Sequence, residues 1–179
     1  MATAAVPWAQ IASECEKEGL SPRNAERIGK ELAKAFGVHE DEVGILRLEK
    51  QNLVFTYPAK LHNVGSIPLN TSTSVAVRTC NSKRADVINN FAQIKHTSVF
   101  EAIELDGQTK ISPSGEKLDR HAHVIQKLMS APVVGPAGTL GVIQVSRKGS
   151  AAPSSGPDFT PLDLQKLVAA ATALVRCFK

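Results

Sequence analysis

Residues 131–146 read APVVGPAGTLGVIQVS, and this stretch decides the predicted fold of the 179-residue chain. Two apolar runs, 124–134 and 140–146, lie on either side of the turn sequence Gly-Pro-Ala-Gly at 135–138. Runs of this length that are rich in Val and are joined by Gly and Pro are typical of a β-hairpin. The sequence therefore predicts two adjacent antiparallel strands in the second half of the chain.

Shorter strand-like segments precede this hairpin. Residues 43–49 and 53–57 alternate apolar and polar side chains around the polar stretch 50–52, which predicts another hairpin that ends at Pro58. Two more short strands are predicted at 66–69 and 86–89, with a helix that begins at Val75 and Ala76 between them. Neighbouring hairpins favour an antiparallel sheet with helices packed on it, which is an α+β arrangement.

Helices are predicted at both ends of the chain. Apolar residues spaced three and four apart predict a first helix from Trp8 to Cys15 and a second one, capped by Ser21, that ends before Gly37. After a connection rich in Ser, Ala and Pro, Thr160 and Pro161 begin a terminal helix that reaches Phe178. We expect a helical pair over 1–40 packed on a domain over 41–179, with flexible insertions near 106–119 and 149–158.

Composition and charge exclude several classes of partner. Aromatic residues make up 4% of the chain, too few to offer the stacking platforms that bind single-stranded nucleic acid, and 21 Lys and Arg are dispersed among 17 acids. No apolar run is long enough to span a membrane, and the N-terminus lacks the pattern of a signal peptide. Three widely separated cysteines favour reduced thiols, so we expect a cytoplasmic protein that binds neither nucleic acid nor membrane.

Three stretches resemble the GAF domain family, and they occur in the family's order. Residues 131–146 resemble its final hairpin, and Phe-Thr-Pro-Leu-Asp-Leu at 159–164 resembles the start of its terminal helix. Ile67-Pro-Leu69, Val75-Ala76, Thr79 and Val87-Ile88-Asn89 resemble its middle. The resemblance implies a profilin-like, six-stranded antiparallel sheet. It further implies a ligand pocket on one face, roofed by mid-chain helices and loops, and terminal helices packed together on the other face.

The resemblance also implies a function. It suggests a stand-alone regulatory or sensory domain that binds a small molecule and signals to a partner protein through its terminal helices. A second interpretation is an interaction or dimerisation module whose pocket is empty or filled by its own side chains. A third is a thiol-based redox enzyme of the free-methionine sulfoxide reductase type. The cyclic-nucleotide signature Asn-Lys-Phe-Asp-Glu and a bilin-attaching cysteine are both missing from the sequence, so neither ligand is expected.

Six side chains are the candidate ligand contacts, because apolar walls with a few polar groups are what ligand sites favour. Ordinary core packing is the alternative explanation for each of them. A histidine in an apolar roof needs a polar partner, which favours His96 as a ligand contact. The six are Phe55, Tyr57, Phe91, His96, Thr97 and Phe100.

Metal binding and catalysis find little support in the sequence. His121 and His123 share one face if they lie in a strand, and His96 would add a third nitrogen, but no further ligand completes a metal site. Cys80 precedes Lys83 and Arg84, whose charges would lower its pKa. Cys15 and Cys177 belong to the terminal helices, so Cys80 lacks a resolving partner. We therefore expect no catalytic residue, no metal and no cofactor other than an unidentified small ligand.

The terminal helix predicts self-association. Leu164, Leu167 and Val168 belong to its apolar stripe, and an alanine-rich flank at 169–173 offers a smooth second surface. A helix of this kind packs on its own sheet and still presents a close surface to another helix. We expect a homodimer that forms through the C-terminal helix, with the Trp8 helix beside it.

Overall fold

A six-stranded antiparallel sheet forms the centre of the molecule. The fold is described by a computed structural model covering residues 6–63, 65–93 and 124–179. The strands lie in the order β3-β2-β1-β6-β5-β4, and every neighbouring pair is antiparallel. They are β1 (Val43–Glu49), β2 (Asn52–Tyr57), β3 (Ser66–Pro68), β4 (Asp86–Ile88), β5 (Ile125–Gly135) and β6 (Gly138–Lys148). The predicted α+β class and antiparallel sheet are confirmed.

The hairpin that decided the fold is the longest strand pair in the described part of the chain. β5 and β6 are joined through a two-residue turn at Pro136 and Ala137, and they stay paired from Gly135–Gly138 to Ile125–Lys148. β6 also pairs with β1, while β5 pairs with β4. The hairpin thus supplies β6, one of the two central strands, and β5 beside it.

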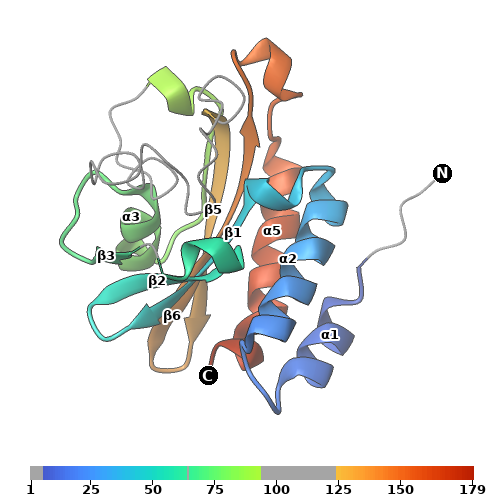
Figure 1. Cartoon of the computed structure of the whole chain (residues 1–179), viewed down its shortest axis with the longest axis vertical. Helices are drawn as coiled ribbons and strands as arrows, with labels where there is room; N and C mark the ends of the chain where they lie inside the picture. The colour runs from blue at the N-terminus through green and yellow to red at the C-terminus, as the bar shows by residue number, and fades with distance from the viewer. Residues whose placement is uncertain (1–5, 64, 94–123) are drawn as a thin grey trace.

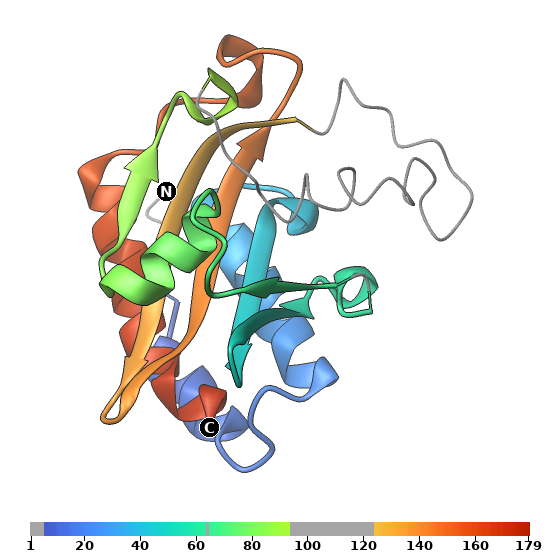
Figure 2. The same ribbon diagram turned by 90° about the vertical axis from the view of Figure 1, so that its left-hand side faces the viewer.

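Helices cover both faces of this sheet (Figure 1). α1 (Trp8–Cys15), α2 (Pro22–Phe36) and α5 (Pro161–Ala173) lie on one face, which we call the helix face. α3 (Val75–Ser82) lies on the opposite face, across β5 and β6 (Figure 2). Short 3-10 helices complete the described structure: η1 (Glu40–Glu42), η2 (Ala59–Leu61), η3 (Phe91–Gln93), η4 (Pro153–Ser155) and η5 (Leu174–Phe178).

Local signals in the sequence set the ends of these helices. The Ser21 hydroxyl accepts a hydrogen bond from the backbone N–H of Asn24 and begins α2, which ends at Gly37 in the left-handed conformation. Thr160 and Asp163 form a reciprocal capping box at the start of α5. The predicted starts of both helices and the end of α2 are confirmed.

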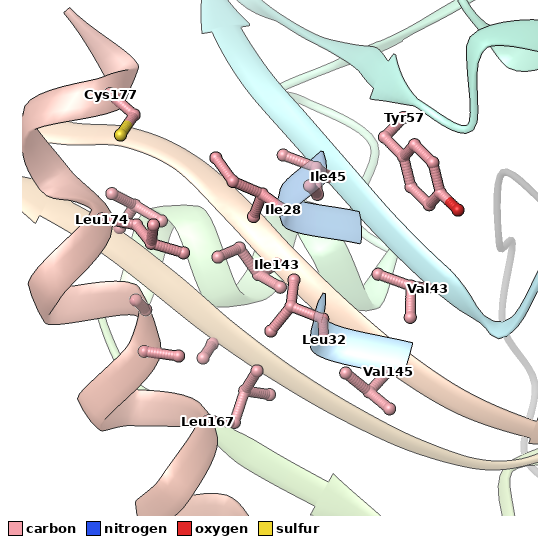
Figure 3. Packing of buried hydrophobic residues seen from close by; sticks show 14 of the residues in the cluster. Ile28, Leu32, Val43, Ile45, Tyr57, Ile143, Val145, Leu167, Leu174 and Cys177 are labelled. Atoms are coloured by element: carbon pink, nitrogen blue, oxygen red, sulfur yellow. The ribbon is translucent and has the colours of Figure 1, made fainter. Parts of the chain in front are cut away.

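The main core lies between the sheet and the helix face. Side chains of β1 and β6, such as Ile45 and Ile143, pack against Ile28 and Leu32 of α2 and against Leu167 of α5 (Figure 3). All five are almost fully buried. α1 and α2 therefore share one continuous core with the sheet.

The opposite face carries two smaller apolar clusters. The Phe55 cluster contains Leu46 and Val142 of the sheet together with Val77 of α3. The Phe91 cluster contains Leu128 and Ile125 of β5. Different parts of the sheet therefore support two separate groups of apolar side chains.

A β-bulge corrects the predicted alternation along β2. Ile45 is opposite Tyr57, but the next residue, Leu46, is opposite Phe55, so Thr56 is an extra residue in this strand. The Thr56 hydroxyl donates to the Ile45 carbonyl at 3.0 Å. As a result, Phe55 faces α3, whereas Tyr57 packs in the main core on the helix face. The prediction that the two aromatic residues share one face is wrong.

The buried stripe of the terminal helix also differs from the prediction. Ala170 packs in the main core with Leu167 and Ala171, and Val168 is 40% exposed. The small side chain of Ala170 allows α5 to lie close against β5. The last turns, at 174–178, continue as the 3-10 helix η5.

The connection at 149–158, predicted as flexible, contains η4 and is held by hydrogen bonds. The Lys127 ammonium, which is buried, donates to the Gly156 carbonyl at 2.6 Å and pairs with Asp158 at 2.9 Å. Gln126 donates to the Gly149 carbonyl at 3.0 Å. The two side chains come from β5, so this strand fastens both ends of the connection. The predicted insertion at 106–119 lies outside the described residues.

Candidate functional site

Polar side chains interrupt the apolar surface of the sheet beneath α3. Gly44 of β1, Gln144 of β6 and Ser130 of β5 lie side by side in the register of the three strands. Gln144 and Ser130 are 6% and 1% exposed, and Gly44 contributes no side chain. This stretch of the sheet therefore has buried polar groups beside a position without a side chain.

A chain of hydrogen bonds connects these groups to α3. The amide nitrogen of Gln144 donates to Ser130 Oγ at 3.2 Å, and Thr79 Oγ1 lies 2.7 Å from the same oxygen. Thr79 also donates to the Val75 carbonyl at 2.9 Å. We call Thr79, Ser130 and Gln144 the polar row.

Only the nitrogen of the Gln144 side-chain amide takes part in this network. Among the residues that the structure describes, none donates a hydrogen bond to its Oε1 atom, while its Nε2 atom binds Ser130. An amide oxygen can accept two hydrogen bonds. It is thus an available acceptor for a donor group on a ligand.

Apolar walls stand on both sides of the polar row. Leu46 and Val142, which are opposite each other in β1 and β6, belong to the Phe55 cluster on one side. Leu128 belongs to the Phe91 cluster on the other side. Apolar walls with a few converging polar groups are the usual composition of small-molecule sites.

The polar side chains continue along β6 toward Lys148. Ser146, two residues after Gln144, is fully buried and donates to the Glu42 carbonyl at 3.1 Å. The Lys148 ammonium donates to the Asp41 carbonyl at 2.9 Å. Burial lowers the pKa of Lys148 to about 8, although the negative charge of Asp41 acts in the opposite direction. A titratable amine therefore ends this strip of polar side chains.

Three of the six predicted ligand contacts, Phe55, Tyr57 and Phe91, belong to the described part of the chain, and these three lie in separate clusters. Phe55 and Phe91 both lie on the α3 face, fully buried and in separate clusters. Tyr57 packs on the helix face, where burial raises its pKa to about 12. His96, Thr97 and Phe100 lie outside the described residues, as do His121 and His123.

Sequence reasoning missed the polar row itself. Ser130 is the one polar residue of the run 128–134 and Gln144 that of the run 140–145, and this was the signal that could have identified them. Their significance depends on strand register, because only the pairing of β5 with β6 places them opposite each other.

The environment of Cys80 contradicts the predicted activation of its thiol. Cys80 is buried on α3 within the Phe55 cluster, and this burial raises the pKa of its thiol. A hydrogen bond with Thr139 acts in the opposite direction but is the smaller effect. The prediction that Lys83 and Arg84 lower this pKa is wrong.

An open groove of about 460 Å³ lies on the outer side of α3. Residues 69–72 form one wall, and Val77, Arg78, Asn81 and Ser82 form the other. Phe55, Tyr57 and Phe91, the predicted ligand contacts that the structure describes, do not line this groove. Over residues 6–63, 65–93 and 124–179, no group of three or more metal-ligating side chains occurs, and no helix is long and apolar enough to cross a membrane.

Solved structures show the same fold, although the sequences have diverged widely. The chain is similar to the GAF domain of an Acinetobacter phosphoenolpyruvate-protein phosphotransferase, with a TM-score of 0.64, 13% identity, and coverage of 99% of this chain and 94% of that one. It is also similar to residues 122 to 287 of a methyl-accepting chemotaxis protein, with a TM-score of 0.62, 14% identity and coverage of 94% of each chain.

An enzyme is found among the similar structures as well. The free methionine-R-sulfoxide reductase from Neisseria meningitidis, solved with its substrate, has a TM-score of 0.59 and 15% identity, with coverage of 99% of this chain and 92% of that one. Comparison with protein-family models and with curated proteins finds no match. The strand order, the helices on both faces and these structural neighbours show that the chain has a GAF-like fold.

Proposed function

We propose that this protein is a regulatory domain that binds a small polar molecule over the polar row and transmits its presence through the helix face. The observation that carries the proposal is the buried chain of Thr79, Ser130 and Gln144. A GAF-like fold is consistent with a sensory role, since the similar structures include domains of a phosphotransferase and of a chemotaxis protein.

Burial of three polar side chains in this position is costly for a purely structural core. A buried polar group is tolerated only when it is hydrogen-bonded, and an apolar core of the same shape is often equally stable. The amide oxygen of Gln144 accepts no hydrogen bond from a described residue, and it is not one of the fully buried unpaired atoms, so it remains an acceptor. A ligand that presents an N–H or O–H donor to this oxygen, and an apolar part to the Phe55 or Phe91 cluster, fits the surroundings best.

The strands that contain the polar row also contact the helices on the opposite face of the sheet. Gln144 lies between Ile143 and Val145, whose side chains point to the opposite face and belong to the main core (Figure 3). Ile28 and Leu32 of α2 lie in the same core. A shift of β6 on ligand binding would therefore change the packing of α2. A partner protein that contacts the terminal helices would detect that change.

An interaction module with a self-filled pocket is the second candidate. Phe55 and Phe91 are both 0% exposed, so the protein's own rings already occupy the apolar space beside the polar row. In that case the domain works through its surface alone, and no small molecule stabilises it.

A redox enzyme is the third candidate, and we propose that the protein is not one. The Neisseria reductase shares the fold, but fold likeness alone does not carry an activity. The buried Cys80 thiol has a raised pKa, which disfavours the thiolate that such chemistry needs.

We further propose a cytoplasmic location. All three cysteines are free and buried. Free thiols are usual in reducing compartments, whereas secreted domains of small size tend to carry disulfides.

A thermal-shift screen against small polar metabolites tests the function. We expect at least one compound to raise the melting temperature, and Gln144→Leu to abolish that rise while the unliganded protein stays folded. The matched control is Gln51→Ala, which alters an exposed glutamine in the turn between β1 and β2. If no compound stabilises the protein, the self-filled module is favoured. If Gln144→Leu still responds, the ligand does not bind at the polar row.

A further inference from the structure

Two cysteines from opposite ends of the sequence lie in the main core. Cys15 ends α1 and Cys177 lies in η5, and both are 0% exposed. The Cys177 thiol donates to the Ala12 carbonyl of α1 at 3.7 Å. The two segments lie side by side at the same end of the molecule in Figure 1. Neither sequence spacing nor motif indicated this pair.

The two cysteines belong to the same packed region. The Cys177 thiol contacts the carbonyl of Ala12, one turn of α1 before Cys15, and both cysteines lie in the main core. Burial is the largest cause that raises the pKa of Cys177 to about 11, and the Cys15 side chain acts in the same direction. A disulfide needs two cysteines on segments that lie this close.

The helix that carries Cys15 is short, and its ion pairs to the rest of the protein are exposed. α1 has eight residues and contributes Ile11, Ala12 and Cys15 to the core, and its N-cap residue Pro7 supplies no side-chain hydrogen bond. Exposed ion pairs join its C-terminal end to the end of the chain, at 3.8 Å between Glu16 and Arg176. Exposed pairs of this kind stabilise little. Short terminal helices are among the elements that open locally while the rest of a protein stays folded.

We propose that Cys15 and Cys177 form a reversible disulfide that locks α1 onto η5. In the closed protein both thiols are shielded from solvent. They become reactive when α1 opens, and the disulfide forms as the helix returns. Under oxidising conditions the disulfide therefore holds α1 in its packed position, and under reducing conditions α1 is free to open. The inference does not depend on ligand binding at the polar row.

The oxidant is a low-molecular-weight disulfide such as oxidised glutathione. The thiolate of one cysteine attacks a glutathione sulfur, forms a mixed disulfide and releases one glutathione thiolate. The thiolate of the second cysteine then attacks the protein sulfur, forms the Cys15–Cys177 bond and releases the second glutathione. The two protein thiols lose two electrons and two protons, and oxidised glutathione becomes two reduced glutathione molecules.

Cys80 serves as an internal control. It is buried under α3 on the other face of the sheet, within the Phe55 cluster. It therefore has no access to the terminal helices while the sheet is intact. Cys80→Ser should leave the reaction unchanged.

The first test is mass spectrometry of the full-length, folded protein after incubation with oxidised glutathione. We expect a loss of two hydrogen atoms without added glutathione, and peptide mapping should place the bond between Cys15 and Cys177. Cys15→Ser and Cys177→Ser should lose this product and accumulate the mixed disulfide, while Cys80→Ser should behave as the unchanged protein. Failure of the bond to form in the folded protein, or a bond that involves Cys80, would overturn the proposal.

Locking is tested separately by hydrogen exchange and melting. In the oxidised protein, amides of α1 should exchange more slowly, and the melting temperature should rise by on the order of 10 °C because the bond closes a very long loop. Dithiothreitol should reverse both changes. Equal exchange of α1 in the oxidised and reduced protein would show that the disulfide forms without locking the helix, and would overturn that part.

Discussion

The ring of Tyr57 lies directly against the backbone of Gly29. A Cβ atom placed at residue 29 would overlap three carbon atoms of this ring, so α2 and β2 approach each other as closely as they do only because residue 29 has no side chain. The β-bulge at Thr56 brings the ring to this face of the sheet. Helix, strand and bulge thus depend on one glycine.

Gly29→Ala is predicted to destabilise the protein by about 1–3 kcal/mol, because the added methyl group overpacks the core. The sign of the change is diagnostic. Helix propensity alone would make the same substitution stabilising by roughly 1 kcal/mol. Urea unfolding of both proteins measures the difference.

A second substitution supplies the control for this prediction. Tyr57→Leu removes the ring, so Gly29→Ala should cost much less in that background than in the unchanged protein. Equal costs in the two backgrounds would show that Gly29 is not needed for contact with Tyr57.

The polar row should behave as a coupled network. Ser130→Ala removes the shared oxygen and leaves the Gln144 amide without its partner, which is expected to cost about 1–3 kcal/mol of unfolding free energy. In a Gln144→Leu background the same change should cost less, because the unpaired donor is gone. Additive effects in this double-mutant cycle would mean that the two side chains do not interact.

Lys148 predicts a dependence of stability on alkaline pH. Its pKa falls from 10.5 to about 8 on folding because of burial, so between these values the unfolded chain binds more protons than the folded protein. The free energy of unfolding contributed by Lys148 therefore rises as pH increases from about 8 to 10.5, by about 3 kcal/mol, and is constant below pH 8. Urea unfolding across this range measures it.

The comparison with Lys148→Met isolates this effect. Cys177, with its pKa raised from 9.0 to about 11, lowers stability with increasing pH over that interval and partly masks the rise in the unchanged protein. Because both proteins contain Cys177, the difference between their pH profiles reports Lys148. Parallel profiles would contradict the prediction.

Homodimer formation through α5 remains a prediction. The apolar side chains that α5 exposes are the residues expected at the interface. Leu162 is 58% exposed and Val168 is 40% exposed, and no described residue covers them. A double substitution of both residues by Glu should convert a particle of twice 19.1 kDa into one of 19.1 kDa in light scattering, with little loss of stability. Gln51→Glu adds a charge on a distant turn and should leave the dimer intact. A monomer in the unchanged protein would refute the idea.

Elements with strong local signals could be predicted from the sequence. The β5–β6 hairpin was indicated by two Val-rich runs around Gly135 and Gly138, and α2 by its serine cap and its glycine stop. These signals act over a few residues, so they hold without knowledge of the rest of the fold.

Features that depend on strand pairing could not be predicted in this way. The bulge at Thr56 becomes visible only when β1 is paired with β2, and Gln144 meets Ser130 only through the register of β5 and β6. The Cys15–Cys177 neighbourhood likewise arises from the packing of two distant helices. The candidate site was therefore predicted less well than the fold.

The extra residue in β2 has a consequence for comparing this chain with others of the same fold. If Thr56 were deleted, Phe55 and Tyr57 would be consecutive residues of a regular strand. Consecutive side chains of a regular strand point to opposite faces, so the two rings would keep the orientations that the bulge gives them now. A chain that lacks this residue would therefore still place the two flanking side chains on opposite faces. Sequence alignments of such strands should allow a gap there, since forcing them to equal length would match a side chain of one face with a side chain of the other.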